Sequence, residues 1–378
     1  MWKVPLFELN YNDKESLAVK NVLNSKWLSM GEKTIELEDK FSKFMGPRVN
    51  SIAVSSCTAA IHLSLLAIGV KKGDEVIIPA LSFISQLNII KNIGAKPVLI
   101  DCSSMDNWNI NINQIYKKVT KKTKAIIILH YAGFPCEISK DIIDLCRAKN
   151  ITIIEDVAHA PGAQINSKKC GNFGDIGCFS FFSNKNISAG EGGMVVTKNK
   201  QIEKRVRYLR SHGMTSLSFD KKRGRAVDYD VVIPGLNYRI DEIRSVLAIE
   251  QMKKLNRGNQ LRKINFELYK KLLKNTEIIF PFSNYKNNKS NAFHILSILL
   301  PKFIDRNEVI SFLKSKGIQS SLHYLPYWSF SIYKEEIDSN DFPILKNISN
   351  RQLTLPLYPT LKKDQIEYVC DNLKKLVK

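Results

Sequence analysis

A single lysine stands between an aromatic segment and a glycine cluster in the stretch Phe179-Ser180-Phe181-Phe182-Ser183-Asn184-Lys185-Asn186-Ile187-Ser188-Ala189-Gly190-Glu191-Gly192-Gly193. Apolar runs at residues 176–182 and 194–197 flank it, and short apolar runs bounded by small residues predict strands. Lys185 is therefore expected on the turn between two strands. A lysine held there can act as an amine nucleophile toward an aldehyde. Taken alone, the same pattern also fits a solvated turn lysine in a lysine-rich chain.

Around this stretch, short apolar segments alternate with amphipathic ones. Strands are predicted at residues 51–56, 75–79, 96–101, 125–130 and 151–156, and helices at 58–68, 82–92 and 139–149. The strands are apolar throughout instead of alternating with polar residues, which is typical of a mostly parallel sheet covered by helices. The sequence therefore predicts an α/β fold.

A long amphipathic helix is predicted over about residues 239–273, long enough to bridge two domains. Beyond it, a strand at 295–300 and helices at 308–316 and 363–376 indicate a smaller α/β domain. We expect a large domain over residues 1–250, including an N-terminal segment with helices near 13–23 and 32–44, and a small C-terminal domain over residues 251–378.

Composition limits the class of protein. The 378 residues carry 57 Lys+Arg against 36 Asp+Glu, a net charge of +21, and the basic residues are spread along the chain without a basic arm. A solvated lysine-rich surface explains this most simply, an anionic substrate or cofactor is the next explanation, and nucleic acid the third. The seven cysteines form no Cys-x-x-Cys pair, which predicts free thiols, no zinc site and a reducing, cytoplasmic location. There is no apolar run long enough to suggest a membrane span or a signal peptide.

Several further residues stand where strands end or helices begin. Thr58 and Ala59 open a helix after a strand, where free N–H groups can bind a phosphate, although simple capping is the alternative. Asp156 ends a strand, the edge at which α/β sheets bind ligands, and could hold a proton on a ring nitrogen. Phe83 could stack on a planar ring, and Ser180 could bind phosphate.

Each of these signals is weak alone, and each has an ordinary structural explanation such as a cap or a core aromatic. Together they supply a phosphate site, a ring platform, a carboxylate for a ring nitrogen and an amine for an aldehyde. Pyridoxal 5'-phosphate needs those four groups. The sequence therefore predicts this cofactor.

The chain resembles the DegT family of sugar aminotransferases, which have the aspartate aminotransferase fold, also called fold type I. The resemblance covers nearly the whole length. It rests on the motif at residues 177–193 around Lys185, on residues 235–242, Gly-Leu-Asn-Tyr-Arg-Ile-Asp-Glu, and on flanking stretches at 27–31 and 323–326.

The resemblance implies a role for each matching residue. Lys185 is similar to the family's Schiff-base lysine and proton carrier, and Asp156 to the carboxylate on the pyridine nitrogen. His159 occupies the place near the phenolic oxygen of the cofactor. The phosphate ligands implied are Thr58, Ala59 and Ser180, with Phe83 as the stacking ring; Asn237 would reach the cofactor of a neighbouring subunit, and Ser29, His323 and Tyr324 would face the substrate.

The implied reaction transfers the amino group of L-glutamate, which becomes 2-oxoglutarate, to a nucleotide-linked ketosugar. This would serve amino-sugar synthesis for surface polysaccharide or glycoconjugate, in a homodimer with shared active sites. Arg225 is a candidate phosphate contact of the substrate. Cys57 departs from the glycine that the family usually has before the threonine.

Two alternatives remain open from the sequence. One is a sugar dehydratase of the same family, but those relatives carry histidine in place of Lys185. The other is a regulator without catalytic activity, or a nucleic-acid binder, which would need a basic or helix-turn-helix appendage that the sequence does not display.

Overall fold

A seven-stranded sheet forms the centre of the molecule in a computed structural model that describes residues 2–216, 228–283 and 289–377. Its order is β1-β9-β8-β5-β4-β2-β3. Pairing is parallel from β8 to β3, whereas β9 runs antiparallel to both β8 and β1. The strands are β1 (Asn50–Val54), β2 (Glu75–Pro79), β3 (Lys96–Ile100), β4 (Thr123–Leu129), β5 (Thr152–Asp156), β8 (Ile176–Ser180) and β9 (Gly193–Thr197). The predicted α/β fold with a mostly parallel sheet is confirmed.

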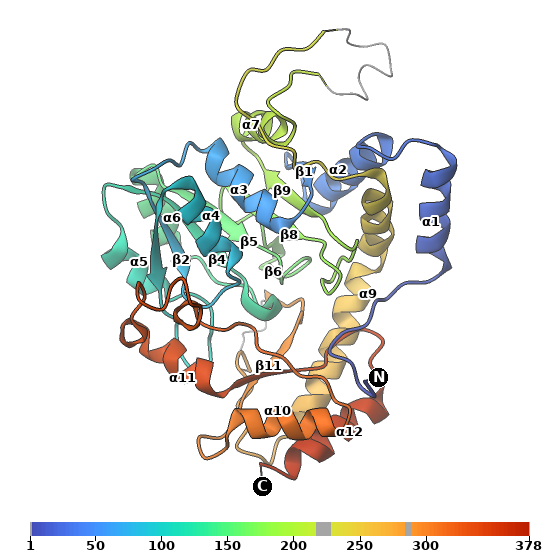
Figure 1. The fold of residues 1–378 in the computed structure, drawn as a ribbon, viewed down its shortest axis with the longest axis vertical. Coiled ribbons are helices and arrows are strands. Elements are labelled where there is room, and N and C mark those ends of the chain that lie inside the picture. The colour runs from blue at the N-terminus through green and yellow to red at the C-terminus, as the bar shows by residue number, and fades with distance from the viewer. Residues whose placement is uncertain (1, 217–227, 284–288, 378) are drawn as a thin grey trace.

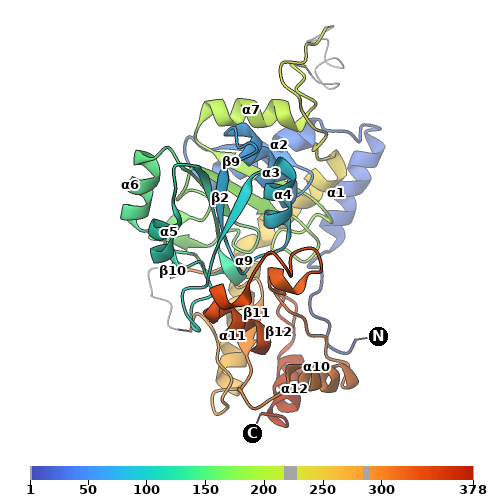
Figure 2. The ribbon, with the colours of Figure 1, turned by 60° about the vertical axis from the view of Figure 1, so that its left-hand side comes forward.

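Helices cover both faces of this sheet, which is why its strands are apolar throughout (Figures 1 and 2). On one face, Val54 and Cys178 pack in a cluster with α3 (Cys57–Ala67), α4 (Ser85–Ile93) and α7 (Lys200–Arg210). On the other face, Ala53 and Phe179 join α2 (Glu32–Met45) and the start of α9 (Glu242–Leu272), while α5 (Ile112–Lys118) and α6 (Lys140–Ala148) cover β4 and β5. Burial on both faces fixes the order of the layers.

The long helix α9 crosses from the sheet to the C-terminal part of the chain (Figure 1). It begins at Glu242, three residues later than predicted, because the Asp241 side chain accepts from the Arg244 N–H at 2.8 Å and caps it. Its second half packs Phe266 and Tyr269 into a core with α10 (Arg306–Ser315), α12 (Lys363–Lys374) and the two-stranded sheet of β11 (Leu296–Leu299) and β12 (Gln352–Leu355).

Some elements were not predicted from the sequence. The helix α11 (Pro343–Arg351) and strand β12 follow one another directly, and a small three-stranded sheet joins β6 (Gln164–Ile165), β7 (Lys168–Lys169) and β10 (Lys289–Ser290). These strands are short, so they give almost no periodic signal.

The N-terminal segment spans the molecule from the C-terminal part to the sheet. Val4 forms a parallel bridge with Ile318, and α1 (Asp13–Asn24) then packs along α9. Between them, the Tyr11 hydroxyl donates to the Ser188 carbonyl at 3.0 Å, in the turn that carries Lys185. The N-terminal segment therefore supports the turn that carries Lys185.

Two further observations concern the described residues. None of their helices is both long and apolar enough to cross a membrane, and no group of three or more His, Cys, Asp or Glu side chains is arranged to hold a metal ion. All seven cysteines are free thiols, and six of them are buried.

Candidate active site

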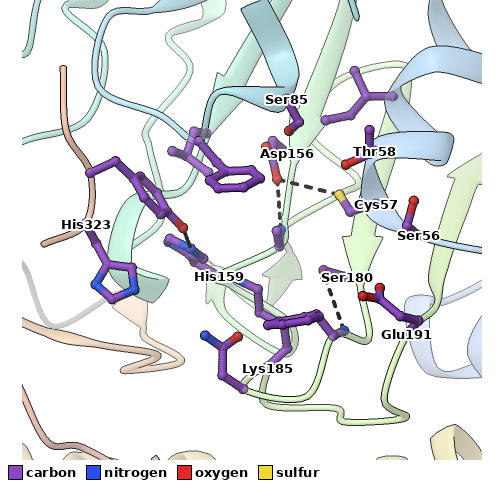
Figure 3. Close-up of a pocket in the computed structure, with 17 residues that line it drawn as sticks. Ser56, Cys57, Thr58, Ser85, Asp156, His159, Ser180, Lys185, Glu191 and His323 are labelled. Carbon is purple, nitrogen blue, oxygen red and sulfur yellow. Dashed lines mark hydrogen bonds between the residues drawn. The ribbon is translucent and has the colours of Figure 1, made fainter. Parts of the chain in front are cut away.

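A cavity of about 380 Å³ opens where β5, β8 and the N-terminus of α3 come together (Figure 3). It brings together eight of the residues predicted from the sequence, namely Thr58, Phe83, Asp156, His159, Ser180, Lys185, His323 and Tyr324. Ala59 follows Thr58 in α3 but is not among the lining residues, and neither are Ser29 and Asn237, which are exposed. Arg225 lies outside the described residues.

Asp156 ends β5 and lies at one side of the cavity with its carboxylate buried. One oxygen accepts from Gln86 Nε2 at 2.7 Å, and the other accepts from the Ala158 N–H at 3.0 Å. Burial raises the pKa of this carboxyl group, against the effect of the two hydrogen bonds and of the Lys185 charge. In the part of the chain that the structure describes, no cation lies within ion-pairing distance of it, so a protonated ring nitrogen fits its chemistry.

Lys185 lies on the turn between β8 and β9, as predicted. The backbone N–H of Lys185 donates to the Phe182 carbonyl at 2.8 Å, and the Ser183 hydroxyl donates to the Gly190 carbonyl at 3.2 Å. These two hydrogen bonds hold the turn together from within. Burial lowers the pKa of the Lys185 amine to about 8, although Asp156 opposes this. A far larger share of this amine is therefore neutral near neutral pH than for an exposed lysine.

The N-terminus of α3 forms the third side. Ser56 caps it by accepting from the Ala59 N–H at 3.0 Å. The N–H groups of Cys57 and Thr58 precede the first intrahelical bond and are available at the cavity, together with the Ser56, Thr58 and Ser180 hydroxyls. Gly193 lets β9 lie close to the N-terminus of α3, because a Cβ at residue 193 would lie 2.5 Å from the Ser56 carbonyl carbon. An anion such as a phosphate fits this end of the cavity.

Cys57, the departure from the family pattern, is the first residue of α3 and has ordinary helical backbone. Its thiol points at Asp156, with Sγ 3.9 Å from a carboxylate oxygen, instead of filling the turn (Figure 3). The cysteine therefore leaves the phosphate end of the cavity open.

His159 and Tyr324 form an aromatic wall with Phe83. Because His159 Nδ1 accepts from the Ala132 N–H at 3.2 Å, its other nitrogen, Nε2, carries the proton and donates to the Tyr324 hydroxyl at 2.7 Å. Burial, and then the Lys185 charge, lower the pKa of His159 well below its usual value, so the ring is neutral. The ring centres of Phe83 and Tyr324 lie 5.5 Å apart, and Phe83 is 55% exposed at the mouth of the cavity.

Several lining or supporting residues were missed by the sequence analysis. Gln86 lies one helical turn after Phe83, and that spacing could have suggested that both face the same site. Glu191, Ser85 and Asn184 also line the cavity, and His294 contacts Lys185 from behind it. A single histidine before a short strand carries no pattern from which its role could be predicted.

Comparison with known proteins gives the family. Residues 10–374 match the DegT/DnrJ/EryC1/StrS aminotransferase family. The GDP-perosamine synthase of Escherichia coli O157:H7 is 32% identical, with 98% of each chain covered. The chain therefore belongs to the DegT/DnrJ/EryC1/StrS aminotransferase family, and it is an aminotransferase.

Solved structures agree with this assignment. A protein of Streptococcus pneumoniae, described as a candidate sugar aminotransferase, superposes in its PLP-form with a TM-score of 0.89 at 26% identity, covering 99% of this chain and 98% of that one. The Helicobacter pylori aminotransferase PseC, involved in the biosynthesis of pseudoaminic acid, gives 0.90 at 25% identity, with 99% of each chain covered. The central sheet and its helices are therefore those of PLP-dependent aminotransferases of fold type I.

Proposed function

We propose that this aminotransferase moves the amino group of L-glutamate to the carbonyl carbon of a nucleotide-linked ketosugar, which becomes an amino sugar. Its cofactor is pyridoxal phosphate, as in the solved relative in the PLP-form. The observation that carries the proposal is the single cavity into which the Lys185 amine, the Asp156 carboxylate and the N-terminus of α3 all open.

Pyridoxal phosphate supplies an aldehyde that bonds to amines and a ring that withdraws electrons from the reacting carbon. Lys185 is proposed to attack that aldehyde, because a substantial share of its amine is neutral at near-neutral pH. Asp156 would keep the proton on the ring nitrogen and Phe83 would stack on the ring. His159 Nε2–H, which donates to the Tyr324 hydroxyl in this structure, would donate to the phenolic oxygen in place of that hydroxyl. The hydroxyls of Thr58 and Ser180, with the N–H of Thr58, would bind the phosphate. The N–H of Ala59, which donates to Ser56 Oγ in this structure, would join them by exchanging that bond for one to the phosphate.

Lys185 has a second proposed task, as proton carrier. A neutral amine can take a proton from one of the two carbons that flank the transferred nitrogen, and the resulting ammonium can deliver it to the other. Because burial sets the pKa of Lys185 near 8, neither form is strongly favoured at near-neutral pH, and proton transfer in both directions is efficient.

The substrate side of the cavity lacks the charge that anionic substrates need. Among the described lining residues, Lys185 is the one cation, and Asp156 and Glu191 are acidic. A nucleotide diphosphate and the glutamate carboxylates therefore require cations from another source, such as Arg225 or a second copy of the chain. Exposed Phe83 and Phe182 at the mouth are 55% and 42% accessible, which favours a cover by another protein surface.

We therefore propose a homodimer with shared active sites, in which exposed Asn237 reaches the cofactor phosphate of the neighbouring copy. Ser29, His323 and Tyr324 would then face the sugar, and the reaction would take place in the cytoplasm as a step toward surface glycans. The names of GDP-perosamine synthase and PseC, two relatives that act in amino-sugar synthesis, support a nucleotide sugar as substrate.

The test is a panel of nucleotide ketosugars incubated with L-glutamate and the purified holoenzyme, with products identified by mass and NMR. An aminosugar formed together with 2-oxoglutarate is the expected outcome. A deoxysugar would instead identify a dehydratase, which the presence of Lys185 argues against. The proposed role of Lys185 fails if the Lys185→Ala protein still forms a lysine adduct with pyridoxal phosphate that borohydride reduces, in the same yield as the unchanged protein.

A further inference from the structure

A buried histidine contacts Lys185 from the side away from the cavity. His294 lies in the segment before β11, is 2% exposed, and places Nε2 at 3.3 Å from the Lys185 amine. It does not line the cavity that holds Asp156; it lines a small separate cavity behind it, beside Asn184. His294 therefore reaches the cavity only through neighbours, namely the Lys185 amine and the His159 ring, whose centre lies 4.5 Å from that of His294.

Two side-chain amides determine which nitrogen of His294 carries its proton. Asn186 Nδ2 donates to the Ala292 carbonyl at 2.8 Å and to Asn259 Oδ1 at 2.7 Å, so the Asn186 oxygen faces His294 Nδ1 at 2.9 Å. Asn259 is oriented in turn, because its Nδ2 donates to the Pro161 carbonyl at 3.0 Å. A carbonyl oxygen can only accept, so Nδ1 carries the proton and the lone pair of Nε2 faces Lys185.

The surroundings keep this imidazole neutral. Burial, followed by the nearby charges of Lys185 and Arg262, lowers the pKa of His294 well below its usual value. Arg262 Nη1 donates to the carbonyl of His294 itself at 2.9 Å, which holds a permanent positive charge beside it. His294 is therefore a hydrogen-bond acceptor for the lysine and does not retain a proton taken from it.

An acceptor at this place directs the amine. A neutral amine has two N–H bonds and one lone pair, and when one N–H donates to Nε2 the lone pair is restricted to directions away from His294, where the cavity lies. We infer that His294 is a positioning residue: it accepts a hydrogen bond from Lys185 and aims the amine, and the Asn186–Asn259 pair holds it in the tautomer that can do so. This inference rests on the proposed role of Lys185 in binding the cofactor.

The experiment measures the pKa of Lys185 in the cofactor-free chain by pulse acetylation across pH, read on the Lys185 peptide by mass spectrometry. His294→Leu removes the acceptor that also stabilises the ammonium form, so the pKa of Lys185 should fall below that of the unchanged chain. The other groups that share this environment are not themselves substituted in this variant; they are Asp156, Cys57, Arg262, His159 and His323.

The second measurement is the rate at which the cofactor-free chain attaches pyridoxal phosphate. In His294→Leu a larger share of the Lys185 amine should be neutral. The variant should nevertheless attach the cofactor about tenfold more slowly, because the hydrogen bond that orients the amine is lost. His294→Gln, which keeps a carbonyl acceptor, should retain most of the rate. Asn259→Ala should slow attachment in the same direction, because it frees the amide that fixes the tautomer.

His62→Leu is the matched control, since His62 is partly buried beside Tyr238 and does not contact Lys185. The inference is overturned if His294→Leu changes neither the attachment rate of pyridoxal phosphate nor the pKa of Lys185. It is also overturned if the pKa of Lys185 rises toward 10.5, because that would mean that water reaches the amine in the variant. If His294→Leu does not fold, His294→Gln and Asn259→Ala decide the question. If the unchanged chain attaches no pyridoxal phosphate at Lys185, the proposed function fails, while acetylation still tests the contact with His294.

Discussion

The low pKa of Lys185 makes a quantitative prediction for cofactor attachment. Burial lowers this pKa from 10.5 to about 8. At pH 7.5 about one quarter of such an amine is neutral, against about one in a thousand for an ordinary lysine, a difference of roughly 200-fold. Only the neutral amine has a lone pair for the aldehyde, so the attachment rate should rise with pH to a midpoint near 8 and then level off.

The assay follows the visible absorbance of pyridoxal phosphate on mixing with the cofactor-free enzyme at each pH. N-acetyl-lysine is the control, because its amine titrates in the ordinary range and the ionisations of free cofactor affect both reactions equally. The pH dependence of attachment is measured in the same way for Asp156→Asn. Because the carboxylate raises the pKa of Lys185, its removal should move the midpoint below 8.

A midpoint at or above pH 10 in the enzyme would refute the reasoning, since it would mean that burial does not destabilise the ammonium form. A midpoint near 8 that moves upward in Asp156→Asn would refute the assigned effect of the carboxylate while leaving the effect of burial intact.

Three further predictions concern the frame of the site. Glu38→Ala should lower the free energy of unfolding by about 3–5 kcal/mol in chemical denaturation, because it leaves the buried guanidinium of Arg210, 2.7 Å away, without its carboxylate partner. Glu36→Ala on the same helix breaks only exposed ion pairs, so it should lower the free energy of unfolding by less than about 1 kcal/mol. Equal losses for the two variants would contradict this. Gly193→Ala should weaken binding of pyridoxal phosphate in a fluorescence titration, because its Cβ would meet backbone at 2.5 Å; unchanged affinity would show that the turn yields without cost. Phe83→Ala should raise the Kd for the cofactor about tenfold or more by equilibrium dialysis while the Lys185 bond still forms, and an unchanged Kd would exclude ring stacking.

The sequence predicted those parts of the molecule that follow from regular patterns. Apolar runs gave the strands of the central sheet, because burial on both faces leaves no other residue types in them. Asp156 and Lys185 could be placed because they adjoin such strands, and a parallel sheet gathers its strand ends at one edge.

The remainder depends on contacts between distant segments. His294 contacts Lys185 only after the C-terminal part folds against the sheet. Gln86 donates to Asp156 from α4, and the sequence of that helix predicts an apolar face but not the residue that Gln86 contacts. The short strand β12 is defined by its partner β11 and not by its own four residues. Such relations are set by tertiary packing, which periodicity along one segment does not encode.

The pairing of β1 has a consequence for the order of events during synthesis. Its one neighbour in the sheet is β9, with Asn50 opposite Thr197, so β1 has no strand partner until β9 has left the ribosome. The turn at Ser56 that follows β1 is held in place only from then on. Tyr324 is made later still, so Lys185 is synthesised well before the last lining residue of its cavity, and a growing chain cannot enclose the cofactor until that residue has been added.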